Sequence, residues 1–233
     1  TMSACGNKFN MIEDIYLTKK NLNYYCQINN TDGLITYRLL DIEKTKYDFY
    51  WEYYNRDGSL VEMCGNGARC ISKHISNIVN KNYLKFINNY DIVMTCKINN
   101  DIVEVQMPEY EDYSLYDNGY FIKVGVPHYV IEVNDINDYD LETAYNDINK
   151  KTELLHNTRC NVNIYTIKNN KVYIRTFEKG VEAETKACGT GCCAVFDNIK
   201  SRNEIEFVNS GGDSLWVKEI DNVIYLSSEV IYT

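Results

Sequence analysis

The chain has 233 residues, of which 45% are hydrophobic and 24% are charged, proportions typical of a globular protein. Its formal net charge is −9 and no cluster of lysine and arginine stands out, which argues against a nucleic-acid partner because phosphate binding needs a basic surface. No apolar run approaches the ~20 residues of a membrane-spanning helix, and the N-terminus has no signal-like pattern. We therefore expect a cytoplasmic protein, not bound to membrane, whose partners are small molecules.

Nine cysteines, an odd number, argue against a disulfide framework in a chain without an export signal. A metal site is also poorly supported, because the sequence has no Cys-x-x-Cys pattern and its three histidines lie far apart. We expect no metal, and we expect most of the cysteines to be small buried hydrophobic side chains.

The first half of the chain opens with a glycine turn, Cys5-Gly6, followed by Asn7. Aromatic and β-branched residues predict strands over 34–40 and 47–54, followed by a turn at 55–59. Apolar residues at helical spacing predict a helix from about 67 to 80. The segments 92–98 and 102–107 are typical of a hairpin.

The second half repeats this order. Pro108 and the acidic, tyrosine-rich residues that follow it, up to Gly119, suggest a link between the halves. Beyond that link, the sequence predicts strands at 120–125 and 129–133, a helix within 138–152, a hairpin at 162–167 and 172–177, and strands at 205–208, 215–220 and 223–227. The parallel order predicts an internal duplication, with domains at 1–115 and 116–233 and an active site in the cleft between them.

Two short stretches carry the chemistry: the first cysteine loop, residues 63–69 (Met-Cys-Gly-Asn-Gly-Ala-Arg), and the second cysteine loop, residues 187–193 (Ala-Cys-Gly-Thr-Gly-Cys-Cys). In each, Gly-x-Gly follows a cysteine and residues that can start a helix follow the glycines. A helix start leaves backbone N–H groups unpaired and carries the positive end of the helix dipole, so it favours an anion and lowers the pKa of a nearby thiol. Two copies predict two thiols that face one ligand.

A thiol and a thiolate on opposite sides of one carbon can invert a stereocentre, because one removes a proton while the other delivers one to the far face. The α-proton of an amino acid is very weakly acidic, so its carboxylate must be held by fixed N–H dipoles that stabilise the developing charge. Two helix N-termini would supply those dipoles.

The stretches 57–70 (Asp-Gly-Ser-Leu-Val-Glu-Met-Cys-Gly-Asn-Gly-Ala-Arg-Cys) and 184–191 (Glu-Thr-Lys-Ala-Cys-Gly-Thr-Gly) closely resemble the two active-site segments of diaminopimelate epimerases. The resemblance extends more thinly over the whole chain. It implies a cofactor-independent racemase or epimerase with a mixed α/β (α+β) fold of two similar halves, each a mostly antiparallel sheet curled around a central helix.

The resemblance also implies roles for individual residues. Cys64 and Cys188 match the acid/base pair of the family, and His128 matches a histidine next to the catalytic site. The substrate-binding positions by the same comparison are Asn7, Asn55, Gly65, Asn66, Asn161, Glu178, Lys179, Gly189 and Thr190.

Two departures from the family pattern fall on the distal substrate pocket. Val126 replaces the asparagine of the usual Gly-Asn-Pro-His, and Lys179 replaces the arginine of Glu-Arg-Gly, although lysine cannot reproduce the two-pronged grip of arginine on a carboxylate. The substrate is therefore open between diaminopimelate and another polar or basic amino acid, such as histidine.

Several alternatives stay open from the sequence. The protein could be a thiol redox protein that cycles a Cys64–Cys188 disulfide, or a module that only binds an amino acid. The phenazine-type isomerases that share the family's fold do not rely on a cysteine pair, so both cysteines weigh against that activity. Asn7 and Asn55 could be turn formers, His128 a packing residue and Lys179 a solvated charge. A homodimer is an open alternative for the assembly.

Overall fold

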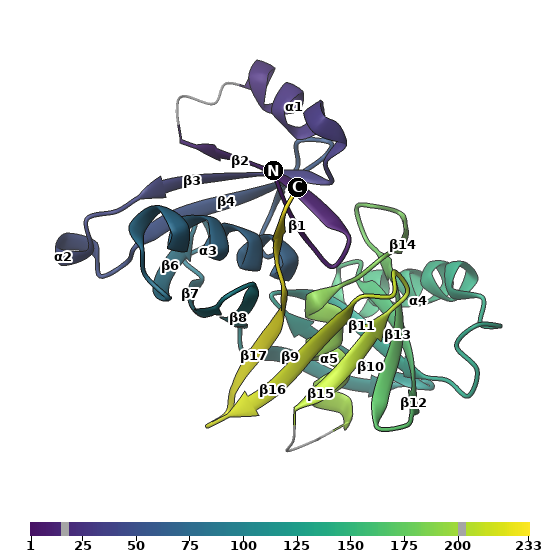
Figure 1. Cartoon of the computed structure of the whole chain (residues 1–233). Coiled ribbons are helices and arrows are strands. Elements are labelled where there is room, and N and C mark those ends of the chain that lie inside the picture. The colour runs from purple at the N-terminus through teal and green to yellow at the C-terminus, as the bar shows by residue number, and fades with distance from the viewer. Residues whose placement is uncertain (15–18, 200–203) are drawn as a thin grey trace. The chain divides into compact units, whose positions relative to one another are not determined.

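The computed structural model describes residues 1–14, 19–199 and 204–233 and divides the chain into two compact units. The first unit comprises Thr1–Gln106 and Ser227–Thr233, and the second comprises Met107–Leu226. Figure 1 shows that each unit combines one sheet with a long helix packed on it.

The sheet of the first unit has the strand order β18-β1-β2-β3-β4-β6-β7-β8. Its pairs are antiparallel except β2–β3 and β4–β6, which are parallel and therefore need crossover connections. Its strands are β1 (Met2–Ala4), β2 (Asn7–Glu13), β3 (Gly33–Leu39), β4 (Phe49–Asn55), β5 (Leu60–Val61), β6 (Tyr83–Asn88), β7 (Val93–Asn99), β8 (Ile102–Gln106) and β18 (Ile231–Tyr232). Its helical segments are α1 (Lys19–Gln27), η1 (Ile28–Asn30), α2 (Ile42–Thr45) and α3 (Gly65–Val79).

Helix α3 is the central helix of the first unit and contacts β1, β2, β6, β7 and β8. Its apolar residues Ala68, Ile71 and Ile75 share one face and are fully buried, as the helical period requires. The helix ends where Asn80 adopts a left-handed conformation with φ of 53° and donates its N–H to the carbonyl of Ser76. Its observed bounds agree with the helix expected at about 67–80.

The sheet of the second unit has the strand order β9-β10-β11-β12-β13-β15-β16, in which β11–β12 and β13–β15 are parallel. Its strands are β9 (Tyr110–Tyr116), β10 (Gly119–Val124), β11 (Val126–Glu132), β12 (Asn161–Lys168), β13 (Lys171–Glu178), β14 (Ala183–Thr185), β15 (Ile205–Asn209) and β16 (Ser214–Ile220); β17 (Val223–Glu229) runs on into the last residues of the chain. Its helices are α4 (Leu141–His156) and α5 (Gly189–Ile199).

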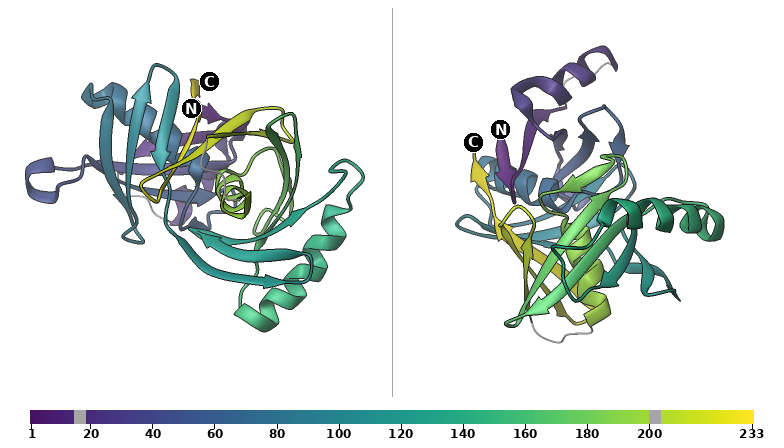
Figure 2. Two further views of the ribbon diagram at one scale, coloured as in Figure 1. Left: turned by 90° about the horizontal axis from the view of Figure 1, so that it is seen from below. Right: turned by 90° about the vertical axis from the view of Figure 1, so that its right-hand side faces the viewer.

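Helix α5 is enclosed by its own sheet. It contacts β10, β11, β12 and β16, and Figure 2 shows the strands curving around it while α4 lies on the outer face. Every residue from Gly189 to Phe196 is buried, because a helix surrounded by strands has no solvent face to reserve for polar residues. Cys192 and Cys193 belong to this core, as expected from the sequence.

The two units repeat one order of pairing, which confirms two similar halves. In each, a hairpin (β1–β2 or β10–β11) leads through a helical crossover to a parallel strand (β3 or β12). The next strand (β4 or β13) pairs antiparallel with it. The central helix (α3 or α5) comes next in the chain, and the strand after the helix (β6 or β15) pairs in parallel with β4 or β13. Each half is thus a mostly antiparallel sheet around one helix.

Residues 108–119 correct one expectation from the sequence. They are not a link between halves, because 110–116 form β9, which pairs with β10 inside the second unit. The units also divide differently from the expected 115/116 boundary: the second begins at Met107, and the last seven residues belong to the first because β18 pairs with β1.

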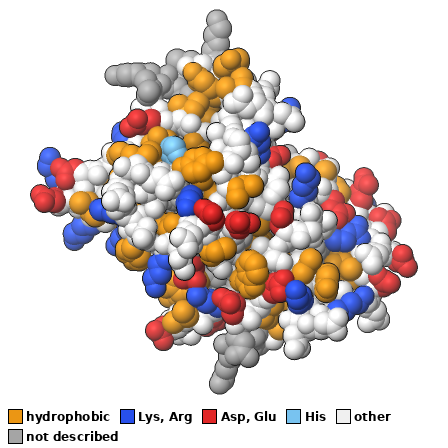
Figure 3. All heavy atoms as spheres, in the orientation of Figure 1, with side chains coloured by type: hydrophobic (Ala, Val, Ile, Leu, Met, Phe, Trp, Pro, Cys, Tyr) orange, Lys and Arg blue, Asp and Glu red, His pale blue; other side chains and the backbone are white. Residues whose placement is uncertain are grey.

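Among the described residues, no helix is long and apolar enough to cross a membrane. Figure 3 shows acidic and basic side chains interspersed over the face it presents.

Asn149 fastens α4 to the start of β12 and offers a test of the second unit's packing. Its buried side chain donates to the carbonyls of Tyr145 (3.0 Å) and Cys160 (3.1 Å) and accepts from the Cys160 N–H (2.7 Å). We expect Asn149→Ala to lower the free energy of unfolding by about 2–4 kcal/mol, because it leaves buried backbone groups unpaired. Urea unfolding measures this change.

Asn146→Ala is the matched control, since Asn146 is exposed on the same helix and its side chain donates to the Glu142 carbonyl at the helix surface. This control is expected to change stability by less than about 0.5 kcal/mol. Equal effects of the two substitutions would contradict the assigned role of Asn149.

Candidate active-site residues

Cys64 is the N-cap residue of α3. Its backbone is extended (φ −140°, ψ 107°), its carbonyl accepts the first helical bond from Ala68 (2.8 Å), and its Sγ accepts from the N–H of Gly67 (3.3 Å). Gly65 and Gly67 are buried beside it. The thiol therefore lies at the positive end of the helix, against backbone N–H groups that favour a negative charge.

Asn66 and Asn7 are brought together from positions far apart in the sequence. The Asn66 Nδ2 donates to Asn7 Oδ1 (2.5 Å), at the start of β2, and Asn66 Oδ1 accepts from the Arg69 guanidinium. Arg69 also contacts Cys5 Sγ, at 3.7 Å. Cys5 and Gly6 form the β1–β2 turn, both with positive φ, so the turn is fastened to α3 at two points.

Asn55 lies elsewhere in the first unit, at the end of β4. Its side chain donates to the hydroxyl of Ser59 (3.1 Å), and its backbone closes the turn through Gly58 and Ser59. In the described structure Asn55 forms a turn, and no described hydrogen bond joins it to the first cysteine loop.

Cys188 occupies in α5 the place that Cys64 occupies in α3. Its carbonyl accepts the first helical bond from Cys192 (3.0 Å), its Sγ lies 3.5 Å from the Thr190 hydroxyl, and it is buried together with Gly189 and Thr190. The Cys188 thiol also hydrogen-bonds the carboxylate of Glu178 at the end of β13. The second cysteine loop therefore pairs its thiol with a carboxylate.

Glu178 has two opposing influences on its ionisation. Burial raises the pKa of its carboxyl group above the ordinary value, while hydrogen bonds from Thr185 and Cys188 lower it; burial is the larger effect. The Thr185 hydroxyl donates to Glu178 Oε1 at 2.6 Å and fixes that oxygen. Glu178 is thus held as a proton acceptor of raised basicity beside a thiol.

His128 is fully buried on β11, in a network that reaches the first turn of α5. The Asn163 Nδ2 bonds both His128 Nδ1 (3.1 Å) and the Tyr129 carbonyl (3.2 Å), while Asn163 Oδ1 accepts from Thr176 (2.9 Å). Because the Tyr129 carbonyl requires a donor, the Asn163 amide group donates, so His128 Nδ1 is an acceptor and the ring proton is on Nε2. Burial lowers the pKa of His128 to about 3, so the ring is neutral.

Gly191 shows how closely this network approaches α5. A Cβ atom at this position would lie 2.3 Å from Asn163 Oδ1, so only glycine fits. His128 Nε2 has no hydrogen-bond partner among the described residues. The ring therefore holds a donor that the protein itself does not use.

Asn161 and Lys179 are joined at the same end of the second sheet, where the Lys179 N–H donates to Asn161 Oδ1 (2.9 Å). The Lys179 residue is exposed. Val126 begins β11 after the tight turn at Gly125. The structure thus gathers Cys64, Gly65, Asn66 and Asn7 in the first unit, and gathers Cys188, Gly189, Thr190, Glu178, Lys179 and Asn161 in the second.

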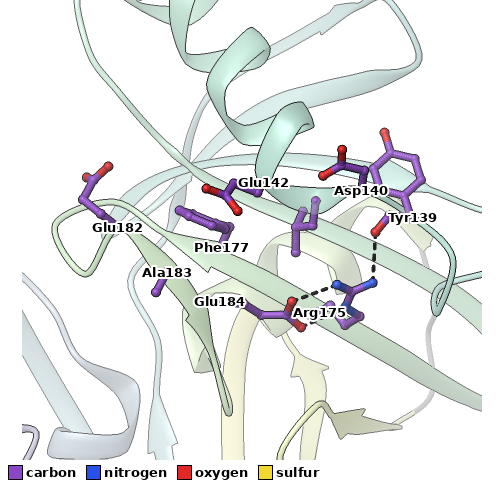
Figure 4. Close-up of a pocket in the computed structure, with 9 residues that line it drawn as sticks. Tyr139, Asp140, Glu142, Arg175, Phe177, Glu182, Ala183 and Glu184 are labelled. Carbon is purple, nitrogen blue, oxygen red and sulfur yellow. Dashed lines mark hydrogen bonds and ion pairs between the residues drawn. The ribbon is translucent and has the colours of Figure 1, made fainter.

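A cavity of about 380 Å³ lies elsewhere in the second unit and contains none of the predicted site residues. It is lined by Tyr139, Asp140, Leu141, Glu142, Arg175, Phe177, Glu182, Ala183 and Glu184. Figure 4 shows Arg175 directed between Glu184, to which it is ion-paired at 2.8 Å, and the Tyr139 carbonyl. Because Arg175, the basic residue of the described lining, is paired with Glu184, the cavity offers no unpaired basic side chain to an anionic ligand.

The remaining cysteines fit the expectation of small buried side chains. Cys70, Cys96 and Cys160 are at most 2% exposed, and burial raises the pKa of each thiol. The Cys26 side chain lies outside the described part of the structure. Within the described residues, no group of three or more His, Cys, Asp or Glu side chains is placed to hold a metal ion.

Two polar residues of these networks, Arg69 and Asn163, were given no role by the sequence analysis. Arg69 is fully buried although the first cysteine loop gave no sign of a partner for its charge. Asn163 lies two residues after Asn161 on β12, so strand alternation places both amides on one face of the sheet. That alternation was the available signal for Asn163.

The family model for diaminopimelate epimerase matches residues 2–111 and 120–226. A diaminopimelate epimerase from Thermotoga maritima is 32% identical to the chain, covering 98% of it and 96% of the relative. The diaminopimelate epimerase of Campylobacter lari is 31% identical, covering 97% and 93%.

Solved structures at low sequence identity share the fold. A predicted epimerase from Pseudomonas aeruginosa matches with a TM-score of 0.71 at 10% identity, covering 97% of this chain and 90% of that chain. A hydroxyproline epimerase from Agrobacterium vitis matches with a TM-score of 0.68 at 9% identity, covering 100% and 88%. The chain belongs to the diaminopimelate epimerase family and is an isomerase of the racemase and epimerase class.

Proposed function

We propose that this protein inverts the α-carbon of a free amino acid, without a cofactor, through Cys64 and Cys188. One observation carries the proposal: each of two topologically equivalent halves places a cysteine at the N-cap of its central helix, followed by Gly-x-Gly. Membership in the family supports the same assignment.

The reaction balances with two thiol groups alone. One cysteine, as thiolate, takes the α-proton and becomes a thiol; the other, as thiol, delivers its proton to the opposite face and becomes a thiolate. Charge that develops on the substrate carboxylate is stabilised by backbone N–H groups of the helix N-termini. Turnover in the reverse direction exchanges the two roles.

The hydrogen bond between Glu178 and Cys188 supports a role for Cys188 as a base. Because the Cys188 thiol donates to this carboxylate, Glu178 can hold the thiol proton when Cys188 must act as the base. Burial of Glu178, which raises its pKa, makes that proton transfer easier than to an ordinary glutamate. The same hydrogen bond orients the Cys188 sulfur.

Diaminopimelate is the first substrate to test, since relatives carrying that name match nearly the full length of the chain. A second candidate is another polar or basic amino acid such as histidine. It is favoured by Val126, which offers no side-chain hydrogen bond, and by Lys179, whose ammonium group cannot make the planar bidentate contact of an arginine.

The thiol chemistry also bears on where the protein works. Both cysteines must be reduced, and the cytoplasm is the compartment that keeps thiols reduced, so we place the enzyme there. The net charge of −9 argues against a nucleic-acid partner. A homodimer is the assembly to test by light scattering after size-exclusion chromatography.

Deuterium exchange tests the function directly. In D₂O, reduced protein is expected to incorporate deuterium at the α-carbon of one member of an amino-acid panel that includes diaminopimelate isomers, lysine and histidine, as followed by NMR. Cys64→Ala and Cys188→Ala should each lower racemisation by about 10²–10⁴-fold or more, since each removes one acid/base group. Cys70→Ala and Cys193→Ala, on the same two helices, are the controls.

If no member of the panel exchanges its α-proton, the protein only binds an amino acid and the proposed catalytic function is wrong. Turnover that consumes a reductant stoichiometrically would instead establish the redox alternative.

Glu178 gives a pH prediction. Its carboxyl group must be ionised to accept the Cys188 proton, and its raised pKa means that it protonates at a higher pH than an ordinary glutamate as the pH falls. We expect kcat/KM to fall on the acid side at a pH above the ordinary glutamate range. Glu178→Gln should lower kcat by about 10²-fold or more and remove this limb.

Glu153→Gln, a change at an exposed position of α4, serves as its control. A Glu178→Gln profile that coincides with that of the wild type would remove Glu178 from the proton path.

His128 is expected to stay neutral, with its proton on Nε2. Nitrogen NMR should therefore show one protonated and one unprotonated ring nitrogen that do not titrate between about pH 5 and pH 8, where an ordinary histidine changes charge. A ring that titrates in that interval, or that carries its proton on Nδ1, would refute the assignment.

A further inference from the structure

Arg69 is a buried cation, and no carboxylate of the described residues forms an ion pair with it. Its side chain is 0% exposed, its Nε and Nη1 atoms have no hydrogen-bond partner, and no ion pair is formed by it among the described residues. Only Nη2 is engaged, by Asn66 Oδ1 and by Cys5 Sγ. Buried charges are costly unless paired, so this arrangement calls for a reason beyond packing.

The bonds of Arg69 fix the direction of a short hydrogen-bond chain. A guanidinium can only donate, so the Asn66 atom that faces it must be the oxygen. The Asn66 amide nitrogen then points to Asn7, and Asn7 must present its oxygen in return. The Asn7 side-chain oxygen is then engaged by Asn66, so the group of Asn7 that can bind a ligand is its amide N–H₂, a donor.

The second unit does not contain this chain of donors. At the topologically equivalent positions, counted from each N-cap cysteine and from each hairpin turn, Thr190 replaces Asn66, Cys193 replaces Arg69 and Val126 replaces Asn7. Thr190 contacts the Cys188 sulfur instead. The donor chain is therefore a feature added to the first half rather than a requirement of the fold that both halves share.

We propose that Arg69 is a positioning residue that sets the polarity of Asn66 and Asn7, so that Asn7 presents N–H donors to a carboxylate of the ligand. The uncompensated guanidinium charge acts in the same direction, because a buried positive charge favours an anion nearby. The inference rests on the proposed function only for the identity of the ligand as an amino acid; the hydrogen-bond direction stands without it.

The ligand-free protein tests the direction of the chain. Side-chain amide exchange with water, measured by NMR, is expected to be about tenfold slower for Asn66 than for Asn7, because the Asn66 protons are hydrogen-bonded. Arg69→Met should abolish this difference. Asn66→Asp keeps an acceptor for Arg69 but removes the donor to Asn7, so the Asn7 amide should turn round and become the protected one.

Kinetics test the consequence for binding. Arg69→Met should raise KM by about tenfold to hundredfold with a smaller effect on kcat, since a contact made equally in ground and transition states changes binding. Arg69→Lys keeps the charge and a donor and should restore much of the loss. Arg38→Met, on the exposed part of β3, is the control for loss of an arginine in the same unit.

The outcomes separate the two proposals. Slow exchange of the Asn7 amide in the wild type, or an unchanged pattern in Arg69→Met, overturns the role of Arg69 whether or not the protein racemises anything. Should Arg69→Met fail to fold, the reversal in Asn66→Asp decides the question, and absence of that reversal overturns the role. Correct amide patterns with no α-proton exchange would instead count against the proposed function alone.

Discussion

Each half of this protein depends on one constraint, the unsatisfied backbone N–H groups at the first turn of a central helix. In both halves a cysteine takes the N-cap position, and Gly-x-Gly follows it in a buried first turn. At Gly191 the constraint is steric, since Asn163 leaves no space for a Cβ atom. The first-turn residues of both helices are buried, and their N–H groups favour a thiol or an anion.

The two halves share this arrangement but differ in the charged side chains near their cysteine loops. The first cysteine loop has a buried guanidinium that reaches Asn66, whereas the second has a carboxylate that hydrogen-bonds its thiol. The Glu178 carboxylate accepts the hydrogen bond of the Cys188 thiol, whereas the Arg69 guanidinium donates to Asn66 beside Cys64. The two cysteine loops therefore have side chains of opposite charge near their helix N-termini.

The sequence predicted the elements whose patterns are local. The glycine loops located α3 and α5, and alternating aromatic and β-branched residues located β3, β4, β12 and β13. Residues 108–119 were mispredicted as a link because Pro108 and the acidic residues are typical of loops, although tyrosines in that run favour a strand once β10 is there to pair with it. The relation of Asn66 to Asn7 could not be predicted, because it depends on how the β1–β2 turn packs against α3.

The burial of the Arg69 side chain could not be predicted from the sequence either. Arg69 would be an ordinary exposed residue on most helices, and only the enclosure of α3 makes its unpaired nitrogens significant. The family resemblance, by contrast, located both N-cap cysteines and Glu178 from short motifs. Residues that belong to a short local motif were thus predictable, whereas the contacts between distant residues that give Arg69 and Asn163 their surroundings were not.

The claim that two thiols act on opposite faces of one carbon is tested most directly by the isotope content of the first turnovers in D₂O. The cysteine that delivers a proton is not the one that removed the α-proton, so the account predicts deuterium at the α-carbon of the product enantiomer and protium in the unreacted substrate. Deuterium that appears equally in recovered substrate and product would indicate one base serving both faces, and would contradict the two-cysteine account.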